Sequence, residues 1–169
     1  FNSLLHGHLL HGHLLHGHLL RGHLLHVHLL HAHLMHAHLH IEDLETQVAQ
    51  LPVDVCFDHI GWPDLSLGVA HPGIQTLCRL LAEGKAWVKL SGLYRLCDAP
   101  YDTADAIVAA LVAANPQRCL WGSDWPHIML NGAEMPRAAC LLDAFHRVVT
   151  DTKTRHRILV DNPAQLYGF

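Results

Sequence analysis

Three polar residues with chemical capability stand directly after apolar segments. His59 follows VDVCFD, Ser91 follows KAWVKL and Asp124 follows RCLWGS. An imidazole can bind zinc, copper or nickel, and a carboxylate can take a proton from water. Each also has a structural interpretation, because a histidine at a strand end often only hydrogen-bonds a loop, and an aspartate often caps a helix. The chemistry therefore depends on whether the fold brings these side chains together.

The surrounding chain alternates between apolar segments and helical patterns. Strands are expected near 53–58, 86–91 and 118–123, with a further strand at 38–41. Helices are expected over residues 41–51, 73–84, 102–115 and 137–149. Apolar strands separated by helices indicate a parallel sheet, here with its helices on one side. Ligands bind such sheets at the carboxyl ends of the strands, where the three polar residues stand.

The ends of the expected helices carry recognisable signals. Pro52 ends the first helix, and Gly84 suits the position just past the end of the second. Asp102 is expected to cap the third helix with its side chain. These signals set the lengths of the connections between strands.

Four segments in this order resemble the amidohydrolase-2 family: CFDHIGWPD, AWVKLSGLYRL, CLWGSDWPH and ILVDNPAQLYGF. Among its branches, the resemblance is to the 2-pyrone-4,6-dicarboxylate lactonase-like metal-dependent hydrolases, and it covers about residues 38–169. It implies an α/β fold, namely the C-terminal part of a (β/α)8 TIM-type barrel. The family's first strand carries a pair of histidines in an HxH motif, and we assign that role to no pair in this chain.

The resemblance also implies roles for four residues. His59 and Asp124 are the catalytic candidates: His59 contacts the substrate carbonyl or a metal, and Asp124 acts as general base on water or as a metal ligand. Arg95 and His127 are the substrate-binding candidates, with Arg95 pairing with a substrate carboxylate because a guanidinium holds one bidentately. The implied cofactor is a divalent metal, zinc or manganese, or none, since the lactonase branch works without one.

Residues 1–40 differ in composition from residues 41–169, so we divide the chain there. The first part holds fourteen of the 19 histidines, and residues 7–41 repeat with a period of five, as in GHLLH. The repeat weakly resembles pentapeptide repeats, which form a β-solenoid. The alternative, which we favour, is a low-complexity segment without a specified fold. Its clustered histidines predict adventitious metal binding.

Composition excludes several classes of protein. A net charge of −4 argues against nucleic-acid binding, and histidines interrupt every apolar run before it reaches the length of a membrane span. The five cysteines are far apart and odd in number, which is typical of reduced thiols in a cytoplasmic protein. We therefore expect a small-molecule substrate and no nucleic-acid or membrane partner.

Two functional hypotheses follow. The first is a hydrolase that opens a lactone or a related C–O or C–N bond of a carboxylate-bearing small molecule. The second is a non-enzymatic fragment with a histidine-rich, adventitiously metal-binding repeat. We expect the chain to be truncated relative to the family's barrel, to show little or no turnover by itself, and to self-associate through open barrel edges.

Overall fold

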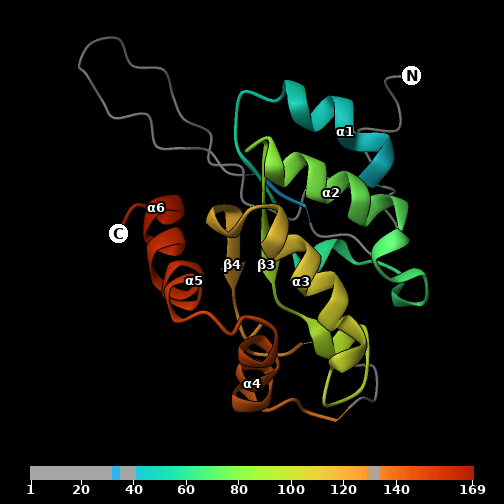
Figure 1. Cartoon of the computed structure of the whole chain (residues 1–169), viewed down its shortest axis with the longest axis vertical. Coiled ribbons are helices and arrows are strands. Elements are labelled where there is room, and N and C mark those ends of the chain that lie inside the picture. The colour runs from blue at the N-terminus through green and yellow to red at the C-terminus, as the bar shows by residue number, and fades with distance from the viewer. Residues whose placement is uncertain (1–31, 35–40, 129, 131–133) are drawn as a thin grey trace.

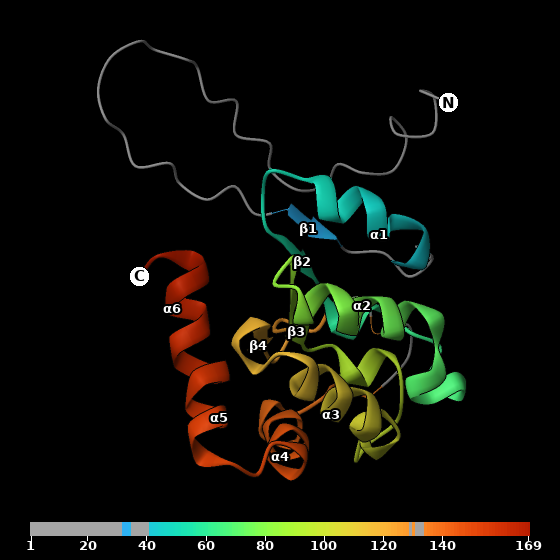
Figure 2. The same cartoon turned by 45° about the horizontal axis from the view of Figure 1, so that its top comes forward.

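A sheet of four parallel strands forms the centre of the molecule. The computed structural model describes residues 32–34, 41–128, 130 and 134–169. The strands lie side by side in chain order: β1 (Ala32–Leu34), β2 (Val55–Phe57), β3 (Ala86–Leu90) and β4 (Cys119–Trp121). Parallel neighbours cannot be joined by tight hairpins, so helices connect β2, β3 and β4 (Figure 2).

Six α-helices accompany the sheet in the described part of the chain. Their bounds are α1 (Ile41–Gln50), α2 (Pro72–Ala82), α3 (Asp105–Ala114), α4 (Ala138–Val148), α5 (Thr152–His156) and α6 (Asn162–Tyr167). Helices α1, α2 and α3 lie next to one another along one side of the sheet (Figure 1). A π-helical segment, Arg157–Asp161, joins α5 to α6, and these helices lie beyond β4.

Side chains alternate between the two faces of the strands. Val55, Val88 and Leu90 pack into the larger core with residues of α2 and α3 such as Leu77 and Leu111. The opposite face has a smaller apolar cluster, made of Cys56, Trp87, Leu120 and Leu166. Leu166 belongs to α6, so a helix also packs on this second face. The expectation that all helices lie on one side of the sheet is therefore wrong.

The expected strands near 53–58, 86–91 and 118–123 are confirmed, and all pair in parallel. The strand expected at 38–41 is wrong at Ile41, which is the first residue of α1, while 38–40 lie outside the described residues. Strand β1 instead comes from residues 32–34 of the repeat and pairs with β2. Most of the repeat, with its solenoid and low-complexity interpretations, lies outside the described residues.

Helix ends follow the expected signals with one exception. Gly84 adopts φ +68° just past α2, a left-handed conformation that glycine adopts without strain. Helix α2 begins at Pro72, and the side chain of His71 accepts a hydrogen bond from the Gly73 amide. The cap expected at Asp102 is wrong: Asp102 is the first residue of a 3-10 turn, and α3 begins only at Asp105, with Ala104 at its N-cap position.

None of the helices that the structure describes has both the length and the apolar character needed to cross a membrane.

Candidate active site

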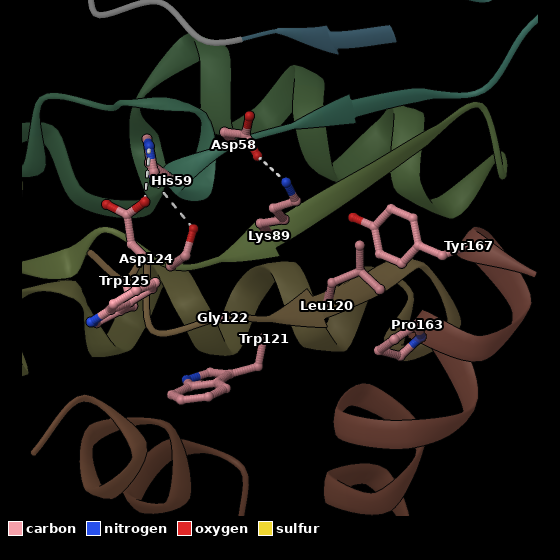
Figure 3. A pocket seen from close by; sticks show the side chains of 11 residues that line it. Asp58, His59, Lys89, Leu120, Trp121, Gly122, Asp124, Trp125, Pro163 and Tyr167 are labelled. Carbon is pink, nitrogen blue, oxygen red and sulfur yellow. Dashed lines mark hydrogen bonds and ion pairs between the residues drawn. The ribbon is translucent and has the colours of Figure 1, made fainter. Parts of the chain in front are cut away.

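A cavity of about 350 Å³ opens at the carboxyl ends of β2, β3 and β4 (Figure 3). Its polar lining includes Asp58 and His59 after β2, Lys89 within β3, Ser91 directly after β3, and Asp124 after β4. The remaining lining is mostly apolar and comes from β4, from the segment after it and from α6: Leu120, Trp121, Gly122, Trp125, Pro163 and Tyr167. The three residues singled out from the sequence, His59, Ser91 and Asp124, therefore share one cavity.

His59 is held in a tight turn after β2. Its backbone has φ +52°, and only 4% of the residue is exposed. The ring nitrogen Nδ1 lies 3.1 Å from Ser91 Oγ. Gly92 leaves room for the ring, since a Cβ on Gly92 would lie 2.4 Å from His59 Nδ1. The other ring nitrogen, Nε2, points toward Asp124.

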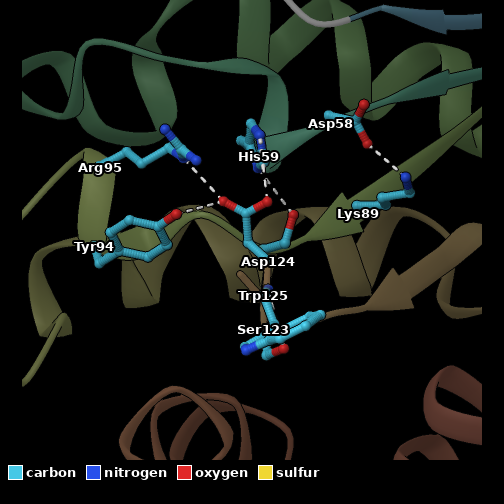
Figure 4. Close-up of polar contacts among 9 residues, drawn as sticks. Asp58, His59, Lys89, Tyr94, Arg95, Ser123, Asp124 and Trp125 are labelled. Carbon is cyan, nitrogen blue, oxygen red and sulfur yellow. Dashed lines mark hydrogen bonds and ion pairs between the residues drawn. The ribbon is translucent and has the colours of Figure 1, made fainter. Parts of the chain in front are cut away.

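Asp124 is fixed by two donors on one of its oxygens (Figure 4). Tyr94 Oη donates to Oδ2 at 2.7 Å, and Arg95 Nε donates to the same oxygen at 2.9 Å. The other oxygen, Oδ1, lies 4.0 Å from His59 Nε2. That separation is too long for a direct hydrogen bond and suits one bridging water or substrate atom.

A second ion pair also lines the cavity. Lys89 Nζ lies 2.8 Å from Asp58 Oδ1, and the Asp58 side chain is only 6% exposed. Burial by itself lowers the pKa of Lys89, but the hydrogen bond and charge of Asp58 outweigh it and raise that pKa overall. Lys89 is therefore a protonated cation inside the cavity.

The electrostatic environment favours neutral forms of two other groups. Burial lowers the pKa of His59, against the charges of Asp124 and Asp58, so the imidazole is neutral at pH 7. Burial, together with the hydrogen bond to Asp124, raises the pKa of Tyr94 to about 12, so its hydroxyl keeps its proton. The site thus combines a neutral imidazole with a carboxylate held by donors.

The structure places the four predicted site residues as follows. His59 and Asp124 come together, although they lie 65 positions apart in the chain. The side chain of Arg95 is 11% exposed and binds Asp124 directly. His127 is buried, with its ring 5.2 Å from that of Tyr94 in an edge-to-face contact, and it is not among the cavity-lining residues.

Two contributors were not predicted as site residues. Tyr94 stands next to Arg95 in the segment after β3, so its proximity to Arg95 was the available signal. Lys89 is a charged residue in an otherwise apolar strand, and the sequence left its direction open. In the structure it points into the cavity, toward Asp58 (Figure 3).

Comparison with known proteins assigns the chain to a family. The family model described as Amidohydrolase matches residues 10–169. A 4-sulfomuconolactone hydrolase from Rhizobium radiobacter is 36% identical over 76% of this chain and 44% of its own length. A 2-pyrone-4,6-dicarboxylate hydrolase from Comamonas testosteroni is 30% identical over 69% of this chain and 42% of its own length.

A solved structure shares the fold. An amidohydrolase from Burkholderia multivorans with bound zinc superposes with a TM-score of 0.61 at 24% identity, over 76% of this chain and 49% of that one. The chain belongs to the amidohydrolase family, because the family model covers most of its length. It spans less than half the length of these two hydrolase relatives.

A metal ion would need more ligands than this site provides. His59 Nε2 and Asp124 Oδ1 are 4.0 Å apart, the largest separation that two ligands about 2 Å from one zinc ion permit. Within the described residues no third histidine, cysteine, aspartate or glutamate joins them into a metal-binding group. The Arg95 guanidinium beside Asp124 further disfavours a cation. The described residues do not fit a complete metal centre.

Proposed function

We propose that this site activates water for the hydrolysis of a lactone that carries a carboxylate. The observation that carries the proposal is the 4.0 Å separation of His59 Nε2 and Asp124 Oδ1 across one cavity. The family assignment supports this reaction class, as do the two relatives named as a 4-sulfomuconolactone hydrolase and a 2-pyrone-4,6-dicarboxylate hydrolase. We further propose that the four strands are the C-terminal part of a (β/α)8 barrel.

In the proposed reaction, Asp124 Oδ1 accepts a proton from a water molecule while the water oxygen attacks the lactone carbonyl carbon. The Nε2–H group of His59 donates a hydrogen bond to the carbonyl oxygen, where negative charge develops. The ring C–O bond then breaks, the departing oxygen takes the proton that Asp124 had accepted, and the new carboxylic acid releases its remaining proton to water. The products are a carboxylate and a hydroxyl group on one open chain.

The roles of Arg95, Tyr94 and Lys89 follow from their contacts. Arg95 and Tyr94 fix Asp124 through Oδ2, which leaves Oδ1 for the water. We propose that the terminal N–H groups of Arg95 bind the substrate carboxylate, with Lys89 adding positive charge to the same cavity. Substrate contact by His127 stays a prediction. Because His127 is buried against Tyr94, we propose that it acts on the substrate through its neighbours.

The test is hydrolysis of 4-sulfomuconolactone and of 2-pyrone-4,6-dicarboxylate by the 169-residue chain, with and without added zinc. We expect the wild type to hydrolyse them at a low rate. Asp124→Asn should decrease this rate by about 100-fold or more, or to the uncatalysed rate if that limit is reached first. Glu83→Gln, at an exposed position at the end of α2, is the matched control and leaves the rate unchanged. Equal rates for the wild type and Asp124→Asn would contradict the proposal.

The same assay decides the alternative of a non-enzymatic chain with a metal-binding repeat. That alternative predicts no hydrolysis above buffer with either lactone, with or without zinc. A cytoplasmic location and self-association through sheet edges stay predictions, and sedimentation equilibrium of the purified chain tests the second.

A further inference from the structure

The two residues directly after β3 contact the His59 ring. Ser91 is 5% exposed, and its hydroxyl oxygen lies 3.1 Å from His59 Nδ1. The next residue, Gly92, has φ +66°, and a Cβ there would lie 2.4 Å from Nδ1 and 2.7 Å from Cγ. The imidazole therefore packs directly against backbone and has a hydroxyl at one of its nitrogens.

The other ring nitrogen faces a group of fixed hydrogen-bonding character. Asp124 Oδ1 lies 4.0 Å from Nε2, and a carboxylate only accepts hydrogen bonds. A neutral imidazole carries one N–H, and a lone pair on Nε2 would face this negative oxygen. The N–H consequently belongs on Nε2, which leaves Nδ1 as an acceptor. A serine hydroxyl can supply the donor that Nδ1 then needs.

We propose that Ser91 is a positioning residue whose hydroxyl donates to Nδ1 and holds His59 in the tautomer with its proton on Nε2. In this tautomer His59 presents a donor beside Asp124, suited to a carbonyl oxygen. The opposite tautomer would present a lone pair, suited to a metal ion. The catalytic consequence rests on the proposed function, whereas the tautomer itself does not depend on turnover.

Nitrogen-15 NMR of the labelled full chain at pH 7.5 tests the tautomer, because protonated and unprotonated ring nitrogens have well-separated shifts. The His59 signals are those missing from His59→Gln. We expect Nε2 of wild-type His59 to carry the proton. In Ser91→Ala the signals move toward a mixture of tautomers, and Ser91→Thr, which keeps a hydroxyl, restores them. Ser66→Ala, at an exposed serine between β2 and α2, leaves them unchanged.

Two results would overturn the proposal: a proton on Nδ1 in the wild type, or a His59 tautomer that Ser91→Ala does not change. In the lactone assay Ser91→Ala is expected to lower kcat by about tenfold, with KM nearly unchanged. Absence of turnover together with the expected tautomer would refute the proposed function and leave the role of Ser91 intact.

Discussion

The two faces of β3 differ in what they carry. Ala86, Val88 and Leu90 face α2 and α3 and belong to the larger apolar core. Trp87 and Lys89 face the other way, where the apolar cluster gives way to the cavity with its ion pair. Both faces are largely buried, so burial does not separate them. They differ in polarity near the carboxyl end, where Lys89 faces the cavity and the polar residues after each strand complete the site.

This contrast predicts that the helix-facing side governs stability and the cavity side governs chemistry. Leu111 of α3 is 0% exposed in the larger core. Leu111→Ala is expected to lower the free energy of unfolding by about 3 kcal/mol, because it removes buried methyl groups and leaves a cavity. Urea unfolding measures this loss. Asp124→Asn should lower the free energy of unfolding by less, about 1 kcal/mol, because the amide oxygen still accepts from Tyr94 and Arg95 although the charge that pairs with Arg95 is lost. Equal losses for the two variants would remove the contrast.

Lys89 sharpens the comparison, because it is the charged member of an otherwise apolar strand. Lys89→Met is expected to lower the free energy of unfolding by about 2 kcal/mol, since it leaves the Asp58 carboxylate buried without its cation. The partial exposure of Lys89 keeps the loss below that of a fully buried pair. Lys89→Met combined with Asp58→Asn should recover part of the loss in the same urea experiment. A double variant as unstable as the sum of the two single variants would contradict a direct pair.

Gly92 joins the two regions, because it lies two residues after β3 and packs against the ring of His59. Gly92→Ala is expected to lower the free energy of unfolding by about 1–2 kcal/mol, owing to its left-handed backbone. The added methyl group also displaces the His59 ring, so the rate of lactone hydrolysis falls by more than the loss of folded protein alone would cause. Gly168→Ala has the same kind of backbone with open space around it and serves as the control. Unchanged hydrolysis in Gly92→Ala would show that the ring is free to move.

The pH dependence from His59 is the smallest effect. Burial lowers the pKa of His59 below its ordinary 6.5, so the unfolded chain binds more protons than the folded one between the two pKa values. Stability is therefore full above about pH 6.5 and falls as pH drops toward the folded pKa. Urea unfolding at pH 7.5 and 5.5 should show a smaller pH dependence for His59→Gln than for the wild type. An identical pH dependence of stability in the two proteins would mean that a group other than His59 causes it.

The sequence predicted the elements better than the contacts between them. Continuous apolar runs located β2, β3 and β4, because strands buried on both faces need such runs. The five-residue repeat gave no persistent face, so β1 was missed. Parallel order implied that His59 and Asp124 meet. No local pattern indicated that Tyr94 and Arg95 would both donate to Asp124, since this depends on the path of the segment after β3.

The central claim is that His59 and Asp124 act together on one lactone, and a double-mutant cycle tests it most directly. Hydrolysis of 4-sulfomuconolactone is measured for the wild type, His59→Gln, Asp124→Asn and the double variant, with unfolding curves to confirm that each is folded. Residues that act as a unit give non-additive effects. The account predicts that the double variant is no slower than Asp124→Asn alone. Rate losses that multiply would mean that the two side chains act independently and would contradict the account.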